Sequence, residues 1–248
     1  MEKLVCILLL NSIIAFGQKP GRVDLEFVHK FENELISFDT TYFNDHNEDL
    51  RFSTINYFVS NISLIRSDGT EYIYPQDSSY FLVKHSKMDD QRQFSLNDIP
   101  PGEYIKLKFV IGVDSLRNTM SIEHRKGALD MGGEGKGMYW IWNSGYIFFK
   151  LEGISSLAPE RGKNKFSYHI GGYGGYKTRT INSIRTVELP LLKFKIHALE
   201  TSKMTVSVDL ERFFKGDFNL RISETPNIMW GNVSEKVADN YVKAFAIQ

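Results

Sequence analysis

Two tryptophans with strand spacing are the residues of this chain that most clearly invite chemistry. Trp140 and Trp142 lie in the segment GMYWIWNSGYIFFKLEG, which spans residues 137–153. Alternate residues of a strand share one face, so we expect both indoles on the same side of one strand. Either the pair anchors a core, or one indole is a redox-active or modified tryptophan beside a metal. Composition alone favours the core.

Two histidines stand in sequence settings that suit either a metal ligand or an ordinary side chain. His169 lies in a predicted strand and is followed by glycines, which allow close approach of other groups. His29 ends the first strand of alternating pattern. Imidazole and thioether are ligands of soft metal ions, and Met131 or Met138 can add a soft sulfur. The alternative for each histidine is an ordinary hydrogen-bonded side chain.

The remaining histidines rank below these two. His85 is the next candidate because it directly follows an apolar strand. Three others lie on polar loops or strand edges and receive no role: His46, His124 and His197.

Oxygen ligands for a hard cation occur around a long polar segment over residues 115–137. Asp114, Asn118 and Asp130 carry the carboxylate and amide oxygens that calcium prefers. Their spacing is not that of an EF-hand loop. An aspartate and serine after a strand also form a common turn, and we favour this turn over calcium.

Catalytic and nucleotide motifs are missing from the sequence. It contains no Gly-x-Ser-x-Gly elbow, no His-Glu-x-x-His and no phosphate loop. The glycines of residues 171–176 lack phosphate-loop spacing and are not followed by Lys-Ser/Thr. The 30 basic and 30 acidic residues cancel, which argues against a general nucleic-acid binder. We therefore expect a binding protein rather than an enzyme.

The N-terminus reads as a secretory signal peptide over residues 1–17. A short charged start precedes an apolar run, and small residues stand at Ala15 and Gly17. Cys6, the only cysteine, lies inside this segment, so disulfides and thiolate metal sites are excluded from the mature chain. No later stretch reaches the length of a membrane span. We expect a periplasmic or secreted protein.

The rest of the chain predicts an all-β fold. Apolar residues make up 42% of the sequence and aromatics 13%, enough for a large core rich in strand-forming side chains. Short alternating segments are separated by turn sequences, which is typical of a sandwich or barrel. We predict one antiparallel β-sandwich-like domain over residues 19–248. The clearest strands are expected within residues 23–29, 55–65, 80–83, 104–113, 145–151, 166–170, 185–192, 194–199 and 204–210.

One short helix is predicted at the C-terminus. Asn232 and Glu235 have the spacing of a capping box. The following apolar residues fall on one helical face: Val237, Tyr241, Ala244 and Phe245. A single helical turn is also expected within residues 210–215.

These motifs together resemble one protein family. The segment GMYWIWNSGYIFFKLEG and the later FSYHIGGYGG look like the MbnP-like copper-binding proteins, which are associated with methanobactin. Further agreement comes from LEFVHKF, INYFVSNISLIRSDG, FSLNDIPPGEY, FVIGVDSLRN and KVADNYVKAF. The resemblance covers nearly all of the mature chain.

The resemblance implies an exported, mostly β protein that binds copper. In characterised members a partner dihaem peroxidase-like enzyme oxidises a tryptophan to kynurenine, which then lies at the copper with histidines. Carried over, the metal ligands are His29 and His169, and the modified residue is Trp140 or Trp142. An outer-membrane transporter is a further partner that this setting implies.

One departure and one alternative reading accompany this resemblance. Many relatives carry a histidine just before the terminal helix, where this chain has only residues 227–231, NIMWG. Met229 can replace it as a soft ligand, or the site has fewer nitrogen ligands.

The competing function is a surface or carbohydrate-binding sandwich module without metal, whose aromatics would be exposed platforms. A hydrolase with an unrecognised site is the weakest reading.

Overall fold

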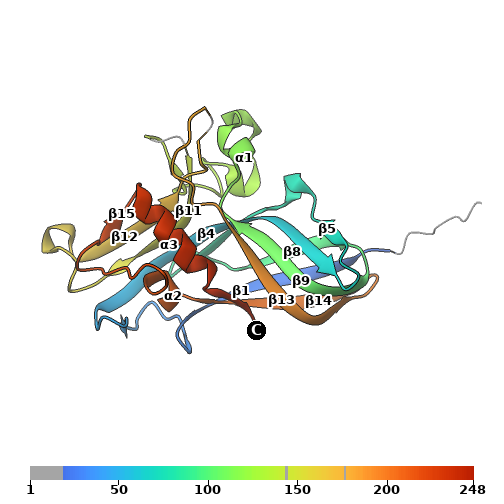
Figure 1. Ribbon diagram of the computed structural model, residues 1–248, viewed down its shortest axis with the longest axis horizontal. Coiled ribbons are helices and arrows are strands. Elements are labelled where there is room, and N and C mark those ends of the chain that lie inside the picture. Colours follow the sequence, from blue (N-terminus) through green and yellow to red (C-terminus); the bar gives the residue numbers. More distant parts are fainter. Residues whose placement is uncertain (1–18, 143–144, 176) are drawn as a thin grey trace, which may run out of the picture.

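The computed structural model describes residues 19–142, 145–175 and 177–248, in which two β-sheets pack face to face (Figure 1). The predicted leader, residues 1–17, lies outside the described residues. Within the described part of the chain, no helix is long and apolar enough to cross a membrane. The expectation of an all-β, sandwich-like domain with a short C-terminal helix is confirmed. The sheets are mixed rather than antiparallel throughout, because each contains a parallel strand pair.

The smaller sheet is built around the first strand, which pairs in parallel with a late strand of the chain. Its members are β1 (Gly21–Phe31), β2 (Glu34–Leu35), β8 (Gln93–Ile99), β14 (Thr201–Asp209) and β16 (Phe245–Ile247). Parallel pairing of β1 with β14 joins residues far apart in sequence, and it runs the length of β1 from Arg22 to Lys30. The first and the last of the described strands, β1 and β16, thereby belong to one sheet.

The larger sheet is centred on one long strand, β4 (Asp49–Arg66). From one edge to the other, the strand order is β13 (Arg185–Ile196), β9 (Gly102–Ile111), β4, β11 (Gly145–Ile154), β12 (Lys165–Gly171) and β15 (Asn227–Ile228). Shorter strands pair off this path: β3 (Tyr42–Phe43), β5 (Glu71–Ile73), β6 (Tyr80–Ser86), β7 (Asp90–Gln91) and β10 (Tyr139–Trp140).

Helices are few in the described residues and short. They are α1 (Ser115–Thr119), α2 (Glu211–Phe214) and α3 (Asn232–Val242), with single 3₁₀ turns at Gln76–Ser78, Ile122–His124, Gly127–Leu129 and Glu160–Gly162. The polar segment over residues 115–137 therefore contains α1 and two of these turns.

The C-terminal helix forms where the sequence predicts it, but its start and end differ. Gly231 occupies the N-cap position and no side chain caps the helix, so the predicted capping box is wrong. The Glu235 carboxylate instead accepts a hydrogen bond from the backbone N–H of Asn182 at 2.9 Å. Val237 and Tyr241 are buried as expected, whereas Phe245 lies beyond the helix in β16.

Aromatic side chains from both sheets fill the main core between them. Phe27 of β1 packs edge-on against Tyr57 of β4 and Phe109 of β9, with ring centroids 5.9 and 6.1 Å apart. Every second residue of β1 is buried, which is the pattern of a strand with one face on a core. Burial of these large rings supplies most of the apolar area that stabilises the sandwich.

A second, smaller core lies on the outer face of the larger sheet. It contains Phe58, Leu82, Tyr146 and Phe148 from the sheet, covered by residues of the 113–140 segment such as Leu129. Near Phe58 the central strand is consequently buried on both faces. The segment with α1, at the top of Figure 1, is thus a packed cover for this face.

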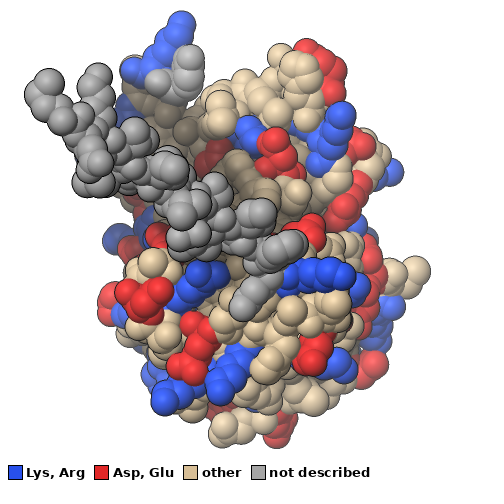
Figure 2. All heavy atoms as spheres, turned by 90° about the vertical axis from the view of Figure 1, so that its right-hand side faces the viewer, with Lys and Arg blue, Asp and Glu red and all other residues tan. Residues whose placement is uncertain are grey.

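Charged side chains of both signs are interspersed on the face that Figure 2 shows, outside the grey atoms. No large area of one sign is visible there. This distribution agrees with the formal net charge of zero and gives no footprint for nucleic acid on that face.

Candidate metal-binding site

Three tryptophans gather at the edge of the second core and form what we call the tryptophan cluster: Trp140, Trp142 and Trp230. The Trp140 and Trp142 ring centroids are 5.5 Å apart, and Trp230 meets Trp140 nearly perpendicularly at 5.9 Å. Trp140 is 5% exposed, whereas Trp142 is 63% exposed. The cluster therefore connects a buried indole to the solvent through an exposed one.

The predicted arrangement of the pair is correct in part. β10 ends at Trp140 and Trp142 stands in the turn that follows, so the two do not share one strand as we expected. Their rings nevertheless lie on the same side and in contact. Trp230 belongs to the cluster because it follows β15, whose neighbour in the sheet is β12. Sequence spacing offered no indication of this contact.

Trp140 is packed directly on the backbone of β12. A Cβ atom placed on Gly171 would lie 2.7 Å from Cζ3 of Trp140, closer than any real side chain allows. Glycine is required here for the indole to approach the strand. Trp140 therefore lies over the face of β12 toward which a side chain at position 171 would point. Its buried Nε1–H has no hydrogen-bond partner among the described residues.

His169 projects from that same face of β12, one strand repeat from Gly171. Alternate residues of a strand share a face at a spacing of about 7 Å. The neighbouring residues Phe166, Tyr168 and Ile170 point the other way, into the main core. His169 and Trp140 therefore both lie on the outer face of the larger sheet.

A carboxylate orients the His169 ring. Nε2 of His169 lies 2.8 Å from Oε1 of Glu152 and 3.1 Å from Oγ of Ser167. Burial by itself would raise the pKa of Glu152, but the hydrogen bond from His169 and the charge of Lys150 lower it to about 2. An ionised Glu152 fixes the proton on Nε2 and leaves Nδ1 of His169 with a free lone pair.

His29 lies elsewhere, between the two sheets. It occupies the buried face of β1, and its Nδ1 lies 2.9 Å from Nδ1 of His85 in β6. Its Nε2 lies 3.0 Å from the Tyr57 hydroxyl. His29 and His169 are thus on opposite faces of the larger sheet. The prediction that these two histidines converge on one ion is wrong, because sequence cannot tell which face of which sheet each strand presents.

Glu152 is the residue near these histidines that the sequence analysis did not name, whereas His85 was ranked there as the next candidate without a role. Alternation in β6 places Phe81, Val83 and His85 on the main-core side. The alternation of apolar residues in this strand indicates from sequence that the His85 side chain faces the core. Glu152 is opposite Ser167 in the ladder between β11 and β12, and this register is known only from the fold.

The comparisons with known proteins agree with this architecture. The sequence profile of the MbnP family matches residues 20–230. The chain belongs to the MbnP family. Its fold is shared by MbnP from Methylosinus trichosporium, with a TM-score of 0.59 at 15% sequence identity, over 87% of this chain and 82% of that one. Among curated proteins none matches the chain.

The three side chains considered as calcium ligands make hydrogen bonds within the chain. The Asp114 side chain caps α1 by accepting from the backbone N–H of Arg117 at 3.1 Å. The buried Asn118 amide binds the Val113 carbonyl and accepts from the Tyr146 backbone N–H. Asp130 accepts from the backbone N–H of Gly132 at 2.9 Å. These contacts fit the turn reading that we favoured.

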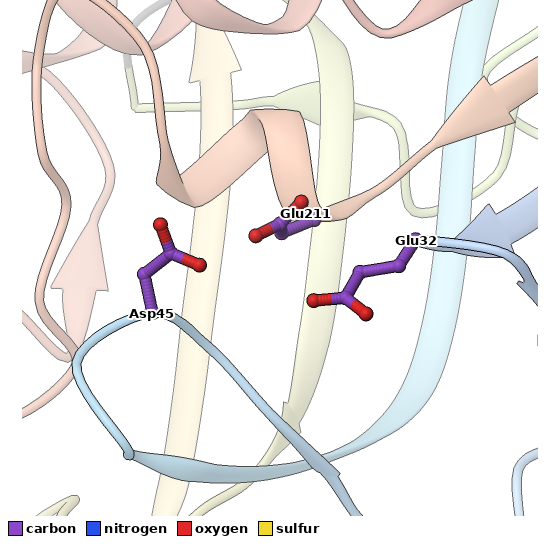
Figure 3. Close-up of side chains that lie close together, drawn as sticks. All are labelled: Glu32, Asp45 and Glu211. Atoms are coloured by element: carbon purple, nitrogen blue, oxygen red, sulfur yellow. The ribbon is translucent and has the colours of Figure 1, made fainter.

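A different acidic group lies near α2 (Figure 3). Carboxylate oxygens of Glu32, Asp45 and Glu211 lie within 4.8 Å of one another and point toward a common space. Lys215 makes ion pairs with both Asp45 and Glu211. This lysine supplies a counter-charge from the chain itself. Burial, together with the neighbouring Asp45, raises the pKa of Glu211 to about 7.

We expect this shifted pKa to make the protein less stable as the pH rises from 4.5 to about 7. The folded state keeps the Glu211 proton up to about pH 7, whereas a free glutamate loses it near 4.5. The stability contributed by the group is therefore complete below pH 4.5 and decreases through that window. Glu211→Gln should raise the melting temperature by a few degrees at pH 8 and leave it unchanged at pH 4. The melting temperatures of both proteins are measured by circular dichroism at each pH. The same pH dependence in wild type and Glu211→Gln would contradict the raised pKa of Glu211.

Proposed function

We propose that the protein is an exported copper-binding protein whose ion is held on the outer face of the larger sheet, between His169 and the tryptophan cluster. One observation carries the proposal: Trp140, whose buried N–H has no hydrogen-bond partner among the described residues, lies over the same face of β12 as His169, whose Nε2 is held by Glu152. A buried N–H without a partner is costly, so such a group in a native fold calls for an explanation.

The donor set fits copper. His169 would contribute Nδ1, while Glu152 holds the other ring nitrogen, as carboxylates do behind many metal-bound histidines. Met229 directly follows β15, which runs parallel to β12 with Ile228 opposite Tyr168. A thioether from this end of β15 is a soft ligand of the kind copper accepts. Met229 thus stands near the place where many relatives carry a second histidine.

Oxidation of Trp140 to kynurenine would complete the site. With hydrogen peroxide as the oxidant, two peroxide molecules would cleave the indole C2–C3 bond, add one oxygen to each carbon and leave as two water molecules. Hydrolysis of the resulting N-formyl group would release formate and leave an aromatic amino group, a further nitrogen donor. Trp142 is exposed and touches Trp140, so an oxidising partner can act at the surface and draw electrons from the buried ring. A dihaem peroxidase-like enzyme is the partner we propose for this step, and an outer-membrane transporter is the proposed partner for copper traffic.

The exposed part of the cluster also supports a second candidate function, a carbohydrate-binding module. Trp142 and Trp230 present 63% and 38% of their surfaces, and flat exposed aromatics can stack on sugar rings. In this case Trp140 is a structural base for the platform, and no metal is needed. Binding of soluble glycans to the metal-free protein, lost in Trp142→Ala, would favour this candidate.

Protein isolated from its own host should distinguish the two. We expect copper in the purified protein and an intact mass that shows conversion of one tryptophan to kynurenine, located by peptide sequencing at Trp140. The matched control is the same chain produced without the partner enzyme, which should carry three unmodified tryptophans. Host-derived protein that lacks copper, with all tryptophans intact, would contradict the proposed function.

A further inference from the structure

The two buried histidines of the main core face each other nitrogen to nitrogen. The His29 and His85 ring centres are 5.0 Å apart and the ring planes differ by 19°. The two Nδ1 atoms are only 2.9 Å apart, so they lie about 2 Å closer than the ring centres. Both nitrogens must therefore lie close to the line between the rings. The imidazoles meet edge to edge, with their Nδ1 positions in line.

Strands of different sheets hold this pair in place. His29 comes from β1 of the smaller sheet and His85 from β6 of the larger one. The Tyr57 hydroxyl lies 3.0 Å from Nε2 of His29 and fixes the orientation of that ring. The Phe38 ring packs edge-on against His85 with centroids 4.7 Å apart. The space around the two nitrogens is therefore lined by aromatic rings and is closed to bulk water on the His29 side.

The pair is available to a ligand at neutral pH. Burial lowers the pKa of His29 well below its usual value and that of His85 to about 4. The 2.9 Å contact between the two Nδ1 atoms requires one donor and one acceptor, so a single proton lies between the facing nitrogens. His85 is 8% exposed, compared with 1% for His29, so His85 is the member of the pair that reaches the solvent.

We propose that His29 and His85 form a second metal site, in which a single Cu(I) ion is bound in line between the two Nδ1 atoms. Cu(I) is commonly two-coordinate and linear, the geometry that these nitrogens already have. The Born cost of burying an ion grows with the square of its charge, so a pair of neutral ligands in an aromatic core favours a monovalent ion over Zn²⁺ or Cu²⁺. The charged groups beside the site are Asp90, which lies opposite His85 in the β6–β7 ladder, and Arg92, which is ion-paired to Asp90.

Ion entry requires small and balanced changes. Two bonds of about 2 Å in line place the nitrogens about 4 Å apart, so the rings must separate by about 1 Å. The proton between the nitrogens moves to Nε2 of His29, where the Tyr57 oxygen accepts it, and no proton leaves the protein. The site is independent of His169, because that residue lies on the other face of the larger sheet.

Anaerobic titration with Cu(I) against a coloured Cu(I) chelator tests this proposal. The whole chain is used, in four forms: wild type, His85→Asn, His169→Ala and His197→Ala, the last an exposed control. The second site predicts that His85→Asn binds one Cu(I) fewer than wild type, with no change in His197→Ala. Equal stoichiometry of His85→Asn and wild type would overturn the second site. A loss confined to His85→Asn, with none in His169→Ala, would instead overturn only the proposed function.

Two further measurements keep the test decisive if His85→Asn does not fold. Tyr57→Phe keeps both imidazoles but removes the hydroxyl oxygen that accepts the hydrogen bond from Nε2 of His29, so its Cu(I) affinity at this site should fall about 10- to 100-fold. In His169→Ala loaded with Cu(I), X-ray absorption should show two nitrogen neighbours at about 2 Å and no sulfur. A sulfur neighbour, or an unchanged affinity in Tyr57→Phe, would contradict the in-line site.

Discussion

Replacement of His169 by alanine is expected to lower copper affinity at the tryptophan cluster by at least about 100-fold. Loss of a group that only orients a metal-bound histidine already costs 10- to 100-fold, and here the ligand itself is removed. The fold should persist, because His169 lies on the outer face of β12 while its neighbours Tyr168 and Ile170 fill the main core. Isothermal titration with a competing chelator measures the change.

Two variants show whether the effect is specific to the ligand. Glu152→Gln keeps the size of the side chain but removes the negative charge that fixes the His169 ring, so a smaller loss of about 10-fold is expected. His197→Ala removes an exposed histidine and should bind copper as wild type does. Wild-type affinity in His169→Ala would exclude this residue as a ligand.

Truncation of Phe245 to alanine is expected to cost about 3–5 kcal/mol of unfolding free energy. The ring is 6% exposed and packs edge-on against Tyr57 and Phe109, with centroids 5.8 and 5.5 Å apart. Its strand, β16, is the edge of the smaller sheet, so the ring helps to join the two sheets. Urea unfolding followed by tryptophan fluorescence gives the difference.

Phe43→Ala, at a site 57% exposed, is the control and should change stability by less than about 0.5 kcal/mol. A cost below about 1 kcal/mol for Phe245→Ala would show that the core closes around the gap.

The secondary structure was predictable where alternation and turns are strong. β1, β9 and β12 lie where apolar residues alternate, because a strand with one face on a core must alternate. The end of the C-terminal helix was misplaced, since Phe245 fits the helical period and also the edge strand that it in fact occupies. Local periodicity cannot choose between these when tertiary pairing with β14 decides the outcome.

The candidate site was predictable only where its residues share one strand or one motif. His169 and Trp140 were selected from the resemblance, and the fold places them on one face of β12. His29 was wrongly grouped with His169, because the partner of β1 across the core is set by long-range sheet packing. The contact between His29 and His85 depends on the facing of two sheets, which no local pattern encodes.

The most direct test of the copper site is a crystal structure of the protein loaded with copper, with diffraction data collected on both sides of the copper absorption edge. The account predicts an anomalous peak within bonding distance of Nδ1 of His169, beside Trp140 or its kynurenine product, on the outer face of β12. No peak on this face, with His169 still bound to Glu152 and Nδ1 unligated, would contradict it.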